Sequence, residues 1–160
     1  MLTTYTTYDD VRAALGVSTD DLEDATLALA IYDDALTQEL EDVALTLQET
    51  FTAMSVNPSP TAQETRFLTA CRLFSTYAVA KMLTSALPLF AAKDITDGKA
   101  ATGRFDNPYK DVVKSINERY ATQRTRLVNA LAAVGTASAT GTARVYMAVA
   151  SPSSDPVTGE

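Results

Sequence analysis

The chain has 160 residues, which is enough for one domain with a single hydrophobic core. It contains no His and one cysteine, Cys71, so a His-assisted nucleophile, a zinc site built from Cys and His, and an internal disulfide are excluded. The net charge of −7 argues against binding to nucleic acid. No apolar run reaches the roughly 18 residues of a transmembrane helix, so we expect a soluble protein made in the cytoplasm.

The charge is distributed unevenly along the chain. Residues 1–54 hold twelve acidic side chains and one basic side chain, Arg12, a net charge of −11, whereas residues 55–160 have a net charge of +4. Surfaces of opposite sign can attract each other within one chain or between copies. The alternative is a merely solvated acidic face.

The first predicted helix spans Tyr8 to Leu15. Thr7 can cap its start, Asp9 and Asp10 suit its first turn, and Gly16 can close it.

A long helix is predicted from Asp24 to Met54. Its apolar residues are spaced by three and four, which indicates one buried stripe: Leu29, Tyr32, Leu36, Leu40, Val43, Leu47, Phe51 and Met54. The acidic residues that fall largely off this stripe form a candidate acidic face: Asp33, Asp34, Glu41, Asp42 and Glu49.

Asn57, Pro58 and Pro60 break the chain, and a third helix is predicted from about Thr61 to Ala86. Its aliphatic density suggests a central position. The residues expected to point inward are Phe67, Cys71, Phe74, Ala78 and Met82. We therefore expect Cys71 to be a buried, reduced thiol.

Pro88 ends or kinks that helix, and residues 89–106 are predicted to be a connection. Arg104 beside Phe105 pairs a cation with an aromatic anchor, a combination common at protein interfaces. The candidate interface loop consists of Asp97, Gly98, Lys99, Arg104 and Phe105. The alternative is a surface loop that packs on its own domain.

A last helix is predicted from Pro108 to a stop at Gly135. The residues expected to point inward are Val112, Ile116, Tyr120, Leu127, Leu131 and Val134. We thus expect an all-α bundle of about four helices over residues 1–134.

Residues 135–160 are predicted to form an extended C-terminal docking arm with one strand, at residues 144–150. A lone strand leaves its backbone groups unpaired, so it should pair with another polypeptide. The candidate docking residues are Arg144, Val145, Tyr146, Met147 and Val149. The alternative is a flexible tail in which the residues that suggest a strand alternate by accident.

A catalytic site would have to be built from carboxylates, because the sequence has no His and also lacks the glycine-rich loop that binds phosphate groups. Four adjacent acidic pairs occur: Asp9 with Asp10, Asp20 with Asp21, Asp33 with Asp34, and Glu41 with Asp42. Neighbouring residues on a helix diverge by about 100°, so these pairs do not converge on one point. We expect no enzyme, no metal site and no cofactor.

Four segments together resemble the head-to-tail adaptor (connector) proteins of tailed bacteriophages. They are Tyr-Asp-Asp-Val-Arg-Ala-Ala-Leu-Gly-Val at residues 8–17, the run at 22–29 that leads into the acidic helix, the loop at 97–105, and the helix at 109–127. The likeness covers most of residues 8–134.

This resemblance implies a helical-bundle subunit of a ring, usually of twelve copies, that docks on the portal protein in the virion neck and is assembled in the host bacterial cytoplasm. Terminal arms in such proteins dock on the portal or on a neighbouring subunit, and a tail, tail-terminator or nozzle protein binds on the other side. Twelve copies of a chain of charge −7 would carry about −84, so an acidic channel would let DNA pass without gripping it. The acidic face at residues 33–49 is the candidate channel lining.

Two other functions remain open from the sequence. One is a monomeric or dimeric regulatory module whose acidic helix captures a basic protein. The other is a carboxylate-based lytic enzyme of a virion.

Overall fold

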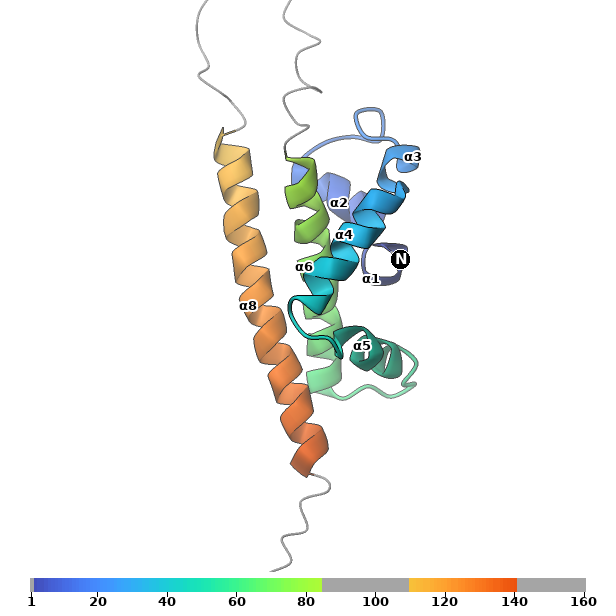
Figure 1. The fold of residues 1–160 in the computed structure, drawn as a ribbon, viewed down its shortest axis with the longest axis vertical. Helices are drawn as coiled ribbons and strands as arrows, with labels where there is room; N and C mark the ends of the chain where they lie inside the picture. Colours follow the sequence, from blue (N-terminus) through green and yellow to red (C-terminus); the bar gives the residue numbers. More distant parts are fainter. Residues whose placement is uncertain (1, 85–109, 141–160) are drawn as a thin grey trace, which may run out of the picture.

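The computed structural model describes residues 2–84 and 110–140 of the chain, with side chains up to residue 135. Within these ranges the protein is all-α, as predicted, and contains seven helices (Figure 1). They are α1 (Leu2–Tyr5), α2 (Tyr8–Leu15), α3 (Asp24–Leu27), α4 (Ala30–Glu41), α5 (Leu47–Ser55), α6 (Ala62–Leu83) and α8 (Lys110–Thr140). The candidate loop at 97–105 and the predicted strand at 144–150 lie outside the described residues.

Helices α6 and α8 run antiparallel beside each other and form the scaffold of the subunit, with the smaller helices packed against α6 (Figure 1). The central position predicted for the third helix is therefore confirmed. Phe67, Cys71, Phe74 and Ala78 are completely buried, as expected, whereas Met82 is only half-buried.

The inward face of α8 repeats at alternating intervals of three and four residues. Its buried and half-buried members are Val113, Ile116, Tyr120, Gln123, Leu127, Ala130 and Val134. This heptad spacing is the one that keeps a long helix in contact with a single partner. Val112, which was expected to point inward, is exposed, and its neighbour Val113 occupies the inward position.

Two predicted helix starts are confirmed by their caps. The Thr7 hydroxyl accepts a hydrogen bond from the Asp10 N–H, and Gly16 ends α2 in the left-handed conformation at φ 73°. At the start of α6, Thr61 and Glu64 form a reciprocal capping box.

The single helix predicted from Asp24 to Met54 is wrong. Leu29 adopts an extended conformation between α3 and α4, which leaves its side chain 52% exposed, and residues 42–46 turn between α4 and α5. One straight helix of 31 residues would be about 46 Å long, against about 33 Å for α6. By breaking twice, the segment brings Leu36, Leu40, Leu47 and Phe51 onto the same core.

The predicted stop at Gly135 is also wrong, because α8 continues to Thr140. A single glycine inside a helix costs only about 1 kcal/mol relative to alanine, and residues 136–140 contain no proline. The first helix, α1, was not predicted at all. Its Leu2 and Tyr5 are buried, and the Tyr5 ring lies 4.5 Å from that of Phe51.

Candidate functional site

The residues of the predicted acidic face come from two helices and not from one. Asp34, Glu41 and Asp42 lie on α4 or at its end, and Glu49 lies on the separate helix α5; all four are exposed. Asp33 has a structural role, because its Oδ1 accepts a hydrogen bond from the Leu2 N–H at 2.7 Å. The structure therefore divides the sequence-predicted set between two helices.

A polar cluster that sequence reasoning missed joins α4, α6 and α8. The Tyr120 hydroxyl donates to Glu39 Oε2, and Lys81 Nζ lies 3.8 Å from Glu39 Oε1 and 3.9 Å from the centre of the Tyr120 ring. Burial, followed by the hydrogen bond to Glu39, raises the pKa of Tyr120 to about 12. The phenol therefore stays neutral at physiological pH and acts as a fixed donor.

Arg12, the lone base among residues 1–54, is buried and ties α2 to the segment before α4. Its Nε donates to the Leu22 carbonyl at 2.8 Å, and its terminal nitrogens bind the carboxylates of Asp9 and Asp24. The charge pattern of the sequence singles out Arg12, but only the fold shows that its side chain holds the segment between α2 and α4 in place.

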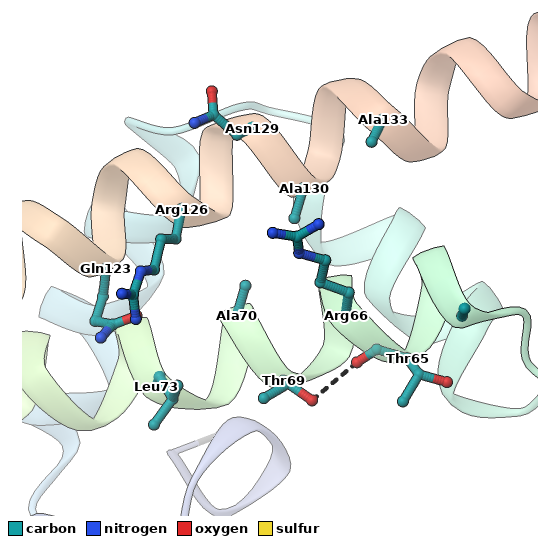
Figure 2. A pocket seen from close by; sticks show the side chains of 11 residues that line it. Thr65, Arg66, Thr69, Ala70, Leu73, Gln123, Arg126, Asn129, Ala130 and Ala133 are labelled. Carbon is teal, nitrogen blue, oxygen red and sulfur yellow. Dashed lines mark hydrogen bonds between the residues drawn. The ribbon is translucent and has the colours of Figure 1, made fainter.

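A groove with a volume of about 610 Å³ lies between α6 and α8, and we call it the α6–α8 groove (Figure 2). Alanines from both helices line much of it: Ala62, Ala70, Ala130 and Ala133. Leu73 adds an apolar side chain that is 37% exposed, while Arg66 and Arg126 stand on opposite walls. None of the described residues that line the groove is acidic.

The two groove arginines differ from most other cations of the scaffold. Helices α6 and α8 carry eight basic residues, and five of them bind a protein acceptor: Arg72, Lys81, Lys114, Arg119 and Arg124. Among the described residues, Arg66, Lys110 and Arg126 have no such partner. Two of these three unpaired cations thus line the groove.

Gln123 lies on the same wall as Arg126 (Figure 2). Its side chain occupies an inward heptad position and is 8% exposed, yet its Oε1 has no hydrogen-bond partner in the described part of the chain. A buried carbonyl without a donor costs about 1–3 kcal/mol. Gln123 therefore holds a buried carbonyl oxygen without a described partner in the wall of the groove.

No three His, Cys, Asp or Glu side chains in residues 2–84 and 110–140 are grouped so as to hold a metal ion. Cys71 is fully buried, as predicted, and burial raises its pKa to about 12, so the thiolate is scarce at neutral pH. None of the described helices is long and apolar enough to cross a membrane.

Comparison of the chain with protein-family models, with curated proteins and with solved structures returned no match. Arguments about function therefore rest on the residues and on the surfaces described above.

Proposed function

We propose that the chain is a non-enzymatic head-to-tail adaptor of a phage neck, which forms a ring on the portal and extends the DNA channel towards the tail. The proposal combines the resemblance of residues 8–134 to phage adaptors with an all-α scaffold in the described part of the chain. In this role, the arm strand at 144–149 and the loop at 97–105 dock on the portal or on a neighbouring subunit.

The observation that carries the proposal is the separation of charge across the subunit. The acidic residues 1–54 form α1 to α5, of which α1, α2, α4 and α5 pack on α6, while Arg66 and Arg126 line a groove whose described lining is free of acidic residues. Surfaces of opposite sign that cannot neutralise each other within one chain favour head-to-tail association of copies. A heterologous contact of this kind closes into a ring when its rotation permits.

The net charge suits a channel for DNA. Each subunit keeps a charge of −7 whatever pairs form between copies, so a ring remains strongly acidic and repels phosphates as the genome passes.

The test is a measurement of size followed by imaging. Light scattering on the purified protein should give a mass that is a multiple of the 17.1 kDa chain and that rises with concentration or on addition of portal protein. Negative-stain images should show rings, and portal particles should gain an extra layer of density. A protein that stays monomeric with and without portal would contradict the proposal.

One observation favours a second candidate, a regulatory module that captures a basic partner. Ile31 and Leu45 are 67% and 83% exposed, and they lie near the exposed acids of α4. Exposed apolar side chains beside carboxylates fit a basic amphipathic helix. A stable monomer or dimer that binds such a peptide would support the module over the ring.

A further inference from the structure

The exposed face of α4 carries a mixed acidic and apolar stripe, which we call the α4 stripe. Its members on α4 are spaced by three and four residues: Ile31, Asp34, Gln38 and Glu41. All four are exposed, and the side chains of Asp34, Gln38 and Glu41 have no partner among the described residues. Two carboxylates and an amide thus follow one apolar side chain along the helix.

The α6–α8 groove presents the complementary set. Arg66 and Arg126 match the two carboxylates, and Leu73 and the alanines match the apolar side chain of Ile31. The lengths also agree, because residues 62–73 of α6 and the whole of α4 are each twelve residues, or about 18 Å of helix. Alanine walls let a third helix approach closely.

The stripe and the groove of one subunit cannot meet. Tyr120 and Arg124, on one flank of α8, bind Glu39 and the Asp42 carbonyl of α4. Arg126 lies two residues beyond Arg124, about 200° around the helix axis, and faces the groove on the other flank. Helix α4 is therefore held on the side of the α6–α8 pair that is opposite the groove.

We infer that the α6–α8 groove receives the α4 stripe of a second copy of the chain, so that each subunit offers its acidic stripe to one neighbour and its groove to the other. This inference deepens the proposed ring and rests on it. It also assigns Asp34 and Glu41 to the contact between subunits, and not to the lining of the channel.

The first test reverses the charges on each side of the contact. The variant Arg66→Glu/Arg126→Glu makes the groove acidic, and Asp34→Lys/Glu41→Lys makes the stripe basic. The side chains of both pairs are exposed and make no hydrogen bond or ion pair with the described residues, so helix content and thermal midpoint should not change. The control Lys110→Glu/Lys114→Glu shifts the net charge by the same amount as the groove variant, but at the start of α8.

We expect the wild type and the control to associate alike in sedimentation velocity. Each reversed variant alone should lose association by at least a hundredfold in Kd, because like charges then face each other. An equimolar mixture of the two reversed variants should assemble again. The acidic stripe of the groove variant then meets the basic groove of the stripe variant, and the basic stripe of the stripe variant meets the acidic groove of the groove variant.

The outcomes separate the groove from the ring. If the wild type forms rings and both reversed variants do so equally well, the groove inference is overturned while the adaptor proposal stands. The groove inference is also overturned, and the adaptor proposal stands, if each reversed variant is monomeric and their equimolar mixture stays monomeric. A wild type that is monomeric at every concentration, with and without portal, overturns both.

A second test maps the contact by disulfide formation. In the double variant Gln38→Cys/Asn129→Cys, one new thiol lies in the stripe and the other beside the groove, so mild oxidation should give a ladder of covalent dimers and larger species. The native Cys71 is buried and should not react. The control Gln38→Cys/Ala121→Cys, with the second thiol on the exposed face of α8, should give no ladder; equal ladders from both variants would refute the inferred contact.

Discussion

Tyr120 on α8 donates a hydrogen bond to Glu39 on α4 across 81 residues of sequence. Glu39 is also 3.8 Å from Lys81 of α6, and the Tyr120 ring packs against Phe74 with its centre 5.6 Å away. Because one phenol thereby contacts two other helices, it fixes the position of α4 on the α6–α8 pair.

We expect Tyr120→Phe to lower the free energy of unfolding by about 1–2 kcal/mol, since the hydrogen bond to a charged acceptor is lost while the ring and its packing remain. Urea denaturation would measure this loss. Tyr77→Phe is the matched control: the Tyr77 hydroxyl accepts a bond from Arg119 at an exposed position, and its removal should cost no more than about 0.5 kcal/mol. Equal losses for both variants would contradict the role given to Tyr120.

Arg12→Met should destabilise the protein by about 2–3 kcal/mol. The change leaves the Leu22 carbonyl without its donor and separates the side chain from Asp9 and Asp24. Arg12→Lys should recover only part of the loss, because one ammonium cannot reproduce three directed N–H groups. Arg72→Met, which breaks the exposed pair with Asp10, should cost no more than about 1 kcal/mol.

Acid should weaken the fold through carboxylates that bind donors in the native state. Burial alone would raise the pKa of Asp10, but the hydrogen bonds from Arg72 and Thr7 outweigh it and hold the pKa below its ordinary value of 3.8. A lowered pKa contributes stability that is present above pH 3.8 and is lost as the pH falls through the folded-state pKa.

Asp10→Asn should therefore reduce the slope of unfolding free energy against pH below about pH 4, in urea titrations at several pH values. The variant should also be slightly less stable than the wild type at pH 7. An unchanged acid slope would mean that Asp10 has the same pKa in the folded and unfolded states.

Removal of residues 141–160 should leave the described fold intact, because the core residues of the described part of the chain all lie before residue 135. The thermal midpoint and helix content should barely move, while binding to the portal or to neighbouring subunits should be lost if the arm is the docking element. Calorimetry and pull-down on the same preparation would measure both. A drop of several degrees in the midpoint would place the arm within the fold.

Local sequence determined that the chain is helical in its described part, α1 apart, and it determined several helix ends. The caps at Thr7 and Thr61, the turn at Gly16 and the inward face of α6 all depend on groups within about four residues of each other, so they can be read from spacing alone. Composition likewise determined that a His-based catalytic site could not form.

Only the tertiary structure decided where residues 24–54 break, because apolar spacing there is compatible with one helix and the breaks arise from the shape of the core around α6. It also decided that Arg12 is buried, that Glu39 meets Tyr120, and that Arg66 and Arg126 border one groove opposite α4. These relationships depend on which helices lie side by side and at what rotation about their axes. That arrangement is set by packing between distant segments, which no local pattern in the sequence contains.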